Sequence, residues 1–177
     1  MEIKAQIMDA VAVNRALMRI AHEIIEQNGE LSALALVGVR TRGVPLSKRI
    51  AENIKSVTGE EVATGILDIT LYRDDLGIIR EHPVINSTEI PFSVMDKTLV
   101  IVDDVLYTGR TVRAAINAVL EYGRPKRIKL AVLIDRGHRE LPIRADYFGK
   151  NIPTSKSEKV VVALTEIDGR DGVDLFK

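Results

Sequence analysis

The segment Leu99 to Thr111, LVIVDDVLYTGRT, contains residues whose types and spacing could hold a sugar phosphate. Four apolar residues precede the carboxylates of Asp103 and Asp104, and the small-residue turn Thr108-Gly109-Arg110-Thr111 follows. Free backbone N–H groups at the start of a helix bind anions. Carboxylates at the end of a parallel strand can accept hydrogen bonds from a vicinal diol. The segment therefore predicts a ribose 5-phosphate site, although the same residues could merely cap a helix and turn the chain.

A second glycine-containing loop, Val37 to Gly43, lies upstream and carries Arg40 and Arg42. Backbone amides flanked by arginines could meet a doubly charged pyrophosphate, but the loop could equally be an ordinary strand-to-helix turn. The other common phosphate motifs are absent, because the sequence has neither Gly-x4-Gly-Lys-Ser/Thr nor Gly-x-Gly-x-x-Gly after its first strand.

The complete string from Leu99 to Thr111 resembles the thirteen-residue phosphoribosyl-pyrophosphate signature of the type I phosphoribosyltransferases. That resemblance implies a central parallel sheet flanked by helices, a flexible loop and a small hood. It implies that the phosphoribosyl pyrophosphate donor contacts Arg40, Thr41, Arg42, Asp103, Asp104, Val105, Leu106, Tyr107, Thr108, Gly109, Arg110 and Thr111. The catalytic group would comprise Asp103, Asp104 and Arg73, with Arg73 on a polar loop from Tyr72 to Glu89 that folds over the donor. Magnesium would bind mainly through substrate oxygens, without a protein metal site.

The same resemblance places the nucleobase beneath a hood built from Asp135 to Pro142 and from Val160 to Leu164. Arg136 and the backbone near Val160 are the expected base contacts. Purine-specific members usually carry an acidic residue three positions after the second signature acid, and Tyr107 stands there in this chain. This difference favours uracil as the base.

Longer blocks resemble a subgroup of the family, the pyrimidine-operon regulators, which also have uracil phosphoribosyltransferase activity. These blocks are Arg19–Glu23, Ile69–Leu76, Asp103–Val112, Asp135–Tyr147 and Gly149–Glu158. The resemblance implies binding of operon leader RNA in response to UMP or UTP, and transcription termination. The implied RNA contacts are Arg19, His22, Thr41, His138, Arg139, Arg144 and Lys150. Met18 and Gln27 depart from the residues usual in the subgroup. A salvage enzyme without RNA binding and a nucleotide-sensing regulator without turnover remain alternatives.

The hydrophobic pattern predicts the elements that position these residues. A helix from about Asp9 to Gln27 is expected, with Asp9 as N-cap and Asn28-Gly29 as its end. The other expected helices are Leu46–Ile54 and Arg110–Tyr122, and the expected strands are Ala33–Val39, Val62–Leu71, Leu99–Val102, Ile128–Ile134 and Val160–Leu164. The alternation of strands and helices predicts an α/β fold.

The composition is that of one globular domain. The chain has 177 residues, 46% of them hydrophobic, which suits a single core over residues 1–177. Its 25 basic and 25 acidic residues cancel, so any nucleic-acid binding must come from a local patch. The absence of cysteine and of a continuous apolar segment near the N-terminus suggests a cytoplasmic protein without a membrane partner. The family resemblance suggests a homodimer or a higher homo-oligomer.

Overall fold

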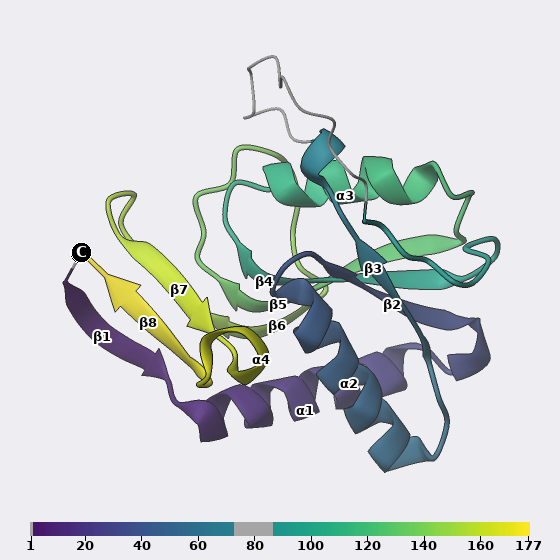
Figure 1. Ribbon diagram of the computed structural model, residues 1–177, viewed down its shortest axis with the longest axis horizontal. Helices are drawn as coiled ribbons and strands as arrows, with labels where there is room; N and C mark the ends of the chain where they lie inside the picture. The colour runs from purple at the N-terminus through teal and green to yellow at the C-terminus, as the bar shows by residue number, and fades with distance from the viewer. Residues whose placement is uncertain (1, 73–86) are drawn as a thin grey trace.

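The computed structural model describes residues 2–72 and 87–177, and its centre is a five-stranded parallel sheet (Figure 1). The strand order is β3-β2-β4-β5-β6, and every neighbouring pair is parallel. The strands are β2 (Leu34–Val39), β3 (Ala63–Leu67), β4 (Thr98–Leu106), β5 (Arg127–Asp135) and β6 (Tyr147–Asn151). The predicted α/β fold with a central parallel sheet is thus confirmed.

Helices cover both faces of this sheet. Helices α1 (Ala10–Gln27) and α2 (Gly43–Thr58) lie on one face, and α3 (Arg110–Leu120) lies on the other (Figure 1). Side chains alternate along β2 accordingly, so that Leu34 and Leu36 join one buried cluster and Ala35 and Val37 join the other. A strand buried on both faces is apolar throughout, which explains why β2 reads as a continuous apolar run.

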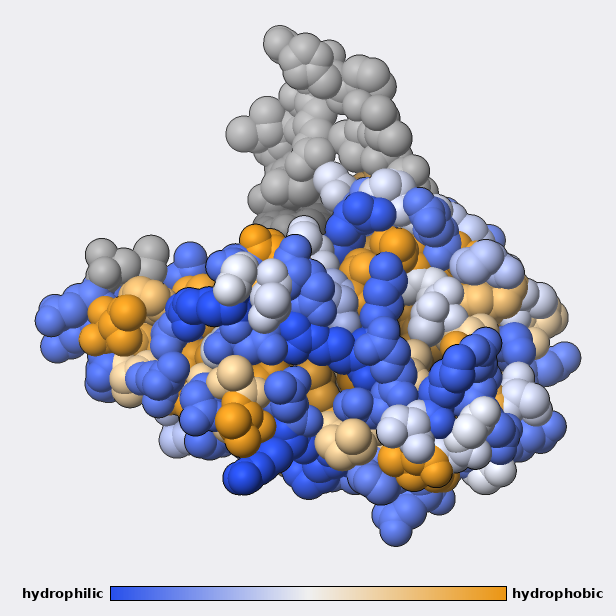
Figure 2. All heavy atoms as spheres, turned by 60° about the horizontal axis from the view of Figure 1, so that its bottom comes forward, coloured by the Kyte–Doolittle hydropathy of each residue, from blue (hydrophilic) through white to orange (hydrophobic). Residues whose placement is uncertain are grey.

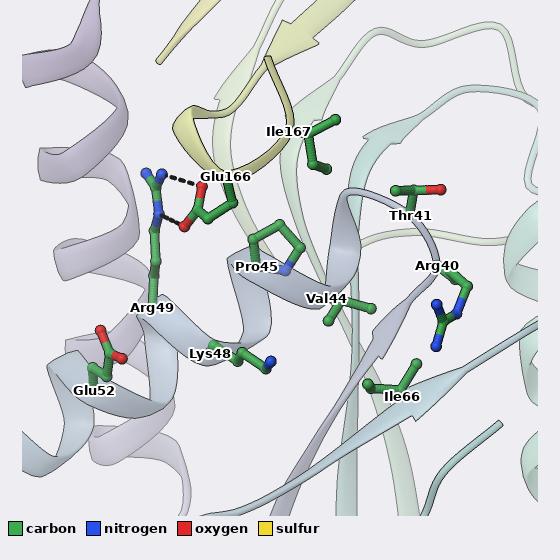
Figure 3. A pocket seen from close by; sticks show the side chains of 10 residues that line it. All are labelled: Arg40, Thr41, Val44, Pro45, Lys48, Arg49, Glu52, Ile66, Glu166 and Ile167. Atoms are coloured by element: carbon green, nitrogen blue, oxygen red, sulfur yellow. Dashed lines mark hydrogen bonds and ion pairs between the residues drawn. The ribbon is translucent and has the colours of Figure 1, made fainter. Parts of the chain in front are cut away.

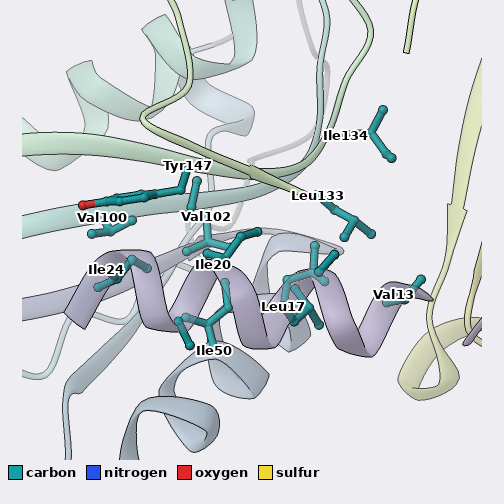
Figure 4. Close-up of a cluster of buried hydrophobic side chains, with 14 of the residues drawn as sticks. Val13, Leu17, Ile20, Ile24, Ile50, Val100, Val102, Leu133, Ile134 and Tyr147 are labelled. Atoms are coloured by element: carbon teal, nitrogen blue, oxygen red, sulfur yellow. The ribbon is translucent and has the colours of Figure 1, made fainter. Parts of the chain in front are cut away.

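The first helix follows the sequence pattern closely. The Asp9 carboxylate accepts a hydrogen bond from the Ala12 amide at 2.8 Å, a cap of a kind worth about 1 kcal/mol, and Asn28 ends the helix. Val13, Leu17, Ile20 and Ile24 form a buried stripe that faces the sheet (Figure 4). In the described part of the chain, no helix is both long and apolar enough to cross a membrane.

A second, three-stranded antiparallel sheet forms the hood. Its order is β1-β8-β7, with β1 (Ile3–Met8), β7 (Lys159–Ala163) and β8 (Gly172–Phe176), and the short helix α4 (Thr165–Asp168) connects its last two strands. The sequence predicted only the β7 part of this sheet. The prediction that the 135–142 segment builds the hood is replaced by a pairing of the two ends of the chain (Figure 1).

Several element boundaries differ from prediction. Strand β4 does not end at Val102 but continues to Leu106, because β5 still pairs with it after β2 has ended. Strand β3 ends earlier than expected, and a 3-10 turn at Thr70–Tyr72 follows it. Of the predicted polar loop from Tyr72 to Glu89, residues 73–86 lie outside the described residues, and Arg73 lies there with them.

Candidate active site

A pocket of about 260 Å³ lies where the loop after β2 approaches the carboxyl end of β4. It brings together two sequence motifs that are about 60 residues apart. The lining residues are Val39, Arg40, Thr41, Arg42, Ile69, Thr70, Asp103, Asp104, Val105 and Thr111. The arginine loop (residues 37–43, which carry Arg40 and Arg42), the acid pair (Asp103 and Asp104) and the start of α3 therefore share one cavity.

The arginine loop is held against β4 by a close backbone approach. A Cβ on Gly43 would lie 2.2 Å from the Val102 carbonyl oxygen, and a Cβ on Gly38 would lie 2.5 Å from the Gly43 oxygen. Only glycine fits at either position. The Arg40–Thr41 peptide bond is cis. The Arg40 guanidinium donates to the Ser87 carbonyl at 3.3 Å, and Arg42 pairs with Asp168 of α4 at 2.8 Å.

The two acids occupy different environments. Asp103 is buried, whereas Asp104 is partly exposed. Burial, and then the neighbouring charge of Asp104, raise the pKa of Asp103 well above its ordinary value. The Asp104 amide donates to Asp103 Oδ1 at 2.9 Å, and the Val105 amide donates to Asp104 Oδ1 at 2.8 Å, so both carboxylates are oriented by the backbone. Each still has an oxygen that can accept a sugar hydroxyl.

The turn after the acids opens α3. Gly109 is its N-cap, with φ 93°, a conformation that favours glycine. The Thr108 carbonyl accepts from the Glu140 amide at 2.9 Å, and Arg110 pairs with Glu140 at 2.6 Å. Among the predicted donor contacts, Leu106 is buried in the core, and Tyr107 to Arg110 form the turn outside the pocket lining.

Asp68, which was not among the predicted site residues, directly precedes Ile69 and Thr70 of the pocket lining. Its carboxylate accepts from the Thr70 hydroxyl at 2.6 Å and from the Ser87 hydroxyl at 2.7 Å. Burial alone would raise its pKa, but these hydrogen bonds prevail and lower the pKa to about 2. Asp68 therefore joins the two chain ends that flank residues 73–86. An aspartate two residues before a threonine is typical of an Asx turn, and this was the available sequence signal.

The candidate base site is built around Tyr107. The Arg136 guanidinium lies 4.1 Å from the centre of the Tyr107 ring, and the His138 ring meets it edge-on at 6.0 Å. Arg136 is buried and donates to Thr154 Oγ1 at 3.2 Å and to the Ser155 carbonyl at 3.0 Å. The Val160 side chain is buried in the core, so only its backbone could meet a ligand.

A larger cavity of about 440 Å³ lies behind the arginine loop, between α2 and α4 (Figure 3). Arg49 closes one side of it by binding Glu166 and Asp171. The hydrogen bond to Asp171 is the largest cause of the raised pKa of Arg49. This cluster ties the hood to α2, the helix that begins at the arginine loop.

The predicted RNA contacts fall into two groups. His22, Thr41 and Arg144 are exposed, and Arg19 and Lys150 are exposed but donate to the backbone carbonyls of Phe148 and Ile7, respectively, at 3.3 Å. His138 and Arg139 are partly buried. Arg139 donates to the Ile143 and Tyr107 carbonyls at 2.9 Å, and His138 Nε2 contacts the Thr154 carbonyl. In this structure the second group stabilises the loop that carries Arg136.

The sequence comparisons agree with one another. Residues 4–167 match the phosphoribosyl transferase domain family. A bifunctional protein PyrR of Acetivibrio thermocellus is 66% identical over 166 residues, which cover 94% of this chain and 90% of that protein. A bifunctional protein PyrR of Thermus thermophilus is 58% identical over 177 residues, which cover 100% of this chain and 98% of that protein.

Solved structures share the fold at lower identity. A hypoxanthine phosphoribosyltransferase of Trypanosoma cruzi has a TM-score of 0.74 at 16% identity, with 99% of this chain and 97% of that chain covered. A hypoxanthine phosphoribosyltransferase of Staphylococcus aureus has a TM-score of 0.74 at 18% identity, with 99% and 93% covered. At these identities the likeness shows the fold alone, and it agrees with the expected type I phosphoribosyltransferase architecture.

Proposed function

Because this chain belongs to the phosphoribosyl transferase family and to its PyrR group, we propose that it converts uracil and phosphoribosyl pyrophosphate to UMP and pyrophosphate. We also propose that it binds pyrimidine-operon leader RNA when a uridine nucleotide is bound, and so promotes transcription termination. The word bifunctional in the names of its relatives supports two activities on one chain.

The observation that carries the enzymatic proposal is the 260 Å³ pocket. The arginines of the pocket can neutralise the charge of a pyrophosphate. The carboxylates of Asp103 and Asp104 can accept hydrogen bonds from the two ribose hydroxyls. The amides at the start of α3 provide a site for the 5-phosphate. A phosphoribosyl donor satisfies all three parts at once, whereas a free nucleotide satisfies only two.

The proposed roles follow from the contacts. The C1–oxygen bond to pyrophosphate breaks as the bond from C1 to uracil N1 forms, and the N1 proton of uracil passes to water. Arg40 and Arg42 stabilise the departing pyrophosphate, while Asp103 and Asp104 fix the ribose. Arg73, outside the described residues, is proposed as a further pyrophosphate contact. Catalysis is then positioning and charge stabilisation.

Magnesium fits this site as an ion that arrives with the donor. No group of three or more histidine, aspartate or glutamate side chains that could hold a metal exists within residues 2–72 and 87–177. Asp103 and Asp104 are the carboxylates in the described lining of the pocket, and magnesium prefers phosphate oxygens and water. When bound, the ion neutralises charge on the pyrophosphate.

The proposed base site favours uracil. Tyr107 stands where purine-specific members carry an acid, and Arg136 lies against its ring. A guanidinium is a hydrogen-bond donor and suits the carbonyl oxygens of uracil. Leader RNA would contact the exposed basic residues described above, and we expect the working form to be a homo-oligomer.

Uracil-dependent release of pyrophosphate tests the enzymatic proposal. The wild type should release pyrophosphate with uracil and not with hypoxanthine. Asp104→Asn should reduce turnover by about 100-fold, because it weakens one side of the ribose contact. Asp96→Asn, at an exposed turn, is the matched control and should keep wild-type turnover. Undiminished turnover in Asp104→Asn would show that the site is wrong.

A filter-binding assay with leader RNA separates the regulator from a plain salvage enzyme. Affinity for leader RNA should rise when UMP is added. Turnover without RNA binding would identify a salvage enzyme, and RNA binding without turnover would identify a regulator that does not catalyse the reaction.

A further inference from the structure

The buried guanidinium of Arg136 is held by a turn between β6 and β7, residues 154–158, which we call the 154–158 turn. Arg136 directly follows β5 and donates from Nε to Thr154 Oγ1 at 3.2 Å and from Nη2 to the Ser155 carbonyl at 3.0 Å. The Thr154 hydroxyl in turn donates to the Arg136 carbonyl at 3.2 Å. Thr154 therefore fixes both the side chain and the backbone of the candidate base contact.

One nitrogen of this guanidinium is left for a ligand. Within residues 2–72 and 87–177, Arg136 Nη1 has no hydrogen-bond partner. The guanidinium also lies against the Tyr107 ring, 4.1 Å from its centre. Because the donors of an arginine are held in one rigid plane, the two bonds to the 154–158 turn decide where the Nη1 donors point.

Glu158 closes the 154–158 turn. The Ser155 amide donates to Glu158 Oε2 at 2.7 Å, and the Glu158 amide donates to the Ser155 carbonyl at 3.3 Å. The same carbonyl accepts from Arg136 Nη2, so Glu158 fixes the position of an acceptor of the guanidinium. Glu158 is buried, although residues 155–157 of the turn are exposed. A buried carboxylate with a single conformation is a rigid support for the turn.

An ion pair across the hood anchors Glu158. Lys4 of β1 donates to Glu158 Oε1, and Oε2 remains bound to the Ser155 amide. Strand β8 lies between β1 and β7, so this ion pair spans the width of the hood sheet. The hood forms one end of the molecule, at the left in Figure 2, where hydrophilic side chains surround small apolar patches. Charge-assisted hydrogen bonds to both carboxylate oxygens thus connect the hood to the residue that meets the base.

We propose that Thr154 and Glu158 are positioning residues that aim Arg136 at the nucleobase. The inference rests on the proposed uracil phosphoribosyltransferase function and adds to it two residues that act without touching the substrate. Thr154 acts on Arg136 directly, and Glu158 acts through the Ser155 carbonyl. Neither residue lines the donor pocket. Loss of either support should therefore weaken binding of the base and leave binding of the donor unchanged.

Two pairs of variants test the two supports in the uracil assay. Thr154→Val removes the hydroxyl and nearly keeps the shape of the side chain, whereas Thr154→Ser keeps a hydroxyl. Glu158→Ala removes the acceptor of the Ser155 amide, whereas Glu158→Gln keeps one. We expect Thr154→Val and Glu158→Ala to raise KM for uracil about 5- to 10-fold, the range of one lost hydrogen bond, with KM for the donor within about twofold of wild type. Thr154→Ser and Glu158→Gln should recover most of this loss.

Lys156→Met, at an exposed position of the same turn, is the control and should keep both KM values. A rise in KM for uracil in this control equal to that in Thr154→Val, or an equal rise in KM for the donor in Thr154→Val, overturns the proposal. Thermal melting checks that each variant is folded at the assay temperature. Thr154→Val changes little volume, so it keeps the test decisive if Glu158→Ala does not fold.

An Arg136→Met background separates positioning from a general loss of structure. Because both residues act through the same guanidinium, Thr154→Val and Glu158→Ala should cause no further rise in KM for uracil in that background. A further rise as large as that in the wild-type background would show that the two residues act independently of Arg136, and would overturn the proposal.

Binding of UMP, measured by calorimetry, distinguishes failure of this proposal from failure of the enzymatic one. UMP affinity should fall in Thr154→Val and Glu158→Ala by about the factor by which KM for uracil rises. If the wild type binds UMP without turnover, the enzymatic proposal fails, and a fall in UMP affinity in Thr154→Val still supports the positioning role. Wild-type UMP affinity in both variants overturns that role, and a wild type with neither turnover nor UMP binding refutes both proposals.

Discussion

Asp103 and Asp104 are adjacent in sequence, yet the fold gives them opposite environments. Asp103 is buried beside a second carboxylate, and its raised pKa means that the folded state holds a proton more tightly than the unfolded chain does. Such arrangements cost stability and are typical of functional sites. Bound ribose hydroxyls would stabilise the ionised form, so the donor itself would offset this cost.

Asp103→Asn should therefore stabilise the free protein and reduce turnover. Above about pH 4 the unfolded chain has released the proton that folded wild type retains, so the free energy of unfolding of wild type falls as pH rises toward the folded-state pKa. The variant lacks this titration and keeps the acceptor for the Asp104 amide. At pH 8 we expect the free energy of unfolding of the variant to exceed that of wild type by about 1 kcal/mol, which corresponds to a rise of about 2–4 °C in Tm. This difference in stability should disappear near pH 4. Thermal melting across this pH range checks the expectation.

The activity of the same variant should fall by about 100-fold in the uracil assay, because it changes a ribose contact. A variant less stable than wild type at pH 8 would contradict the environment described for Asp103. Asp96→Asn again serves as control, with both properties unchanged.

Among the elements, the arginine loop depends on a close backbone contact rather than on side-chain packing. A Gly43→Ala methyl group would lie 2.2 Å from the Val102 carbonyl oxygen, and neither partner is a flexible side chain. We expect a loss of about 2–3 kcal/mol in the free energy of unfolding and a rise of about tenfold in KM for the donor, because the loop must move. Urea denaturation and initial-rate kinetics measure the two effects.

Gly29→Ala is the control for this experiment, because no heavy atom lies within 4 Å of the added methyl group. It should change stability by less than about 0.5 kcal/mol. If Gly43→Ala behaves like Gly29→Ala, the loop is not held by this contact.

We expect Asp68 to act as a positioning residue, because it connects Thr70 and Ser87 near the proposed donor pocket. Ser87 donates to Asp68 and accepts from Arg40, so Asp68 acts on the arginine loop through Ser87. Asp68→Asn should raise KM for the donor several-fold with a smaller change in kcat, and should cost about 1–2 kcal/mol of stability. Because the pKa of Asp68 is lowered to about 2, its contribution is present above about pH 4 and is lost as pH falls to about 2.

The free energies of unfolding of wild type and Asp68→Asn, measured as the pH is lowered, check this pH range. The two values should become equal near pH 2. Glu89→Gln, an exposed neighbour in the same segment, should change neither KM nor the titration. A fall in kcat with unchanged KM would indicate a different role for Asp68.

Elements that follow from the local hydrophobic pattern could be predicted from the sequence, whereas elements that depend on pairing between distant segments could not. The α1 stripe and the β2 run reflect burial by adjacent elements, so the sequence pattern identified both. The end of β4 depends on which neighbour still pairs with it, and no local pattern contains that information. Strands β1 and β8 pair across the whole length of the chain, and β6 is an edge strand with Gly149 at its centre, so all three escaped prediction. Asp68 likewise acquires its partner Ser87 only from a nonlocal contact.

At the scale of the molecule, ion pairs connect the hood to the arginine loop and to α2. Arg42 of the arginine loop binds Asp168, and Arg49, about two turns further along α2, binds Glu166 and Asp171. Because α4 and the strands beside it belong to the hood, the position of the hood is coupled to that of the arginine loop. Partly buried arginine pairs of this kind orient elements more than they stabilise them.

A double-mutant cycle of Arg49→Met and Asp171→Asn measures this coupling. The Arg49 and Asp171 side chains are 17% and 10% exposed, so their pair should be screened less than a surface pair. We expect a coupling energy of about 1–2 kcal/mol at pH 7 by urea denaturation. The hydrogen bond from Arg49 is the largest cause that lowers the pKa of Asp171 to about 2, so the coupling should persist above about pH 4 and disappear as pH falls to about 2. The exposed pair Lys55 and Glu61 is the control, and its cycle of Lys55→Met and Glu61→Gln should give a much smaller coupling energy, because solvent screens the two charges. Equal coupling in the two cycles would mean that the hood is held by its apolar core alone.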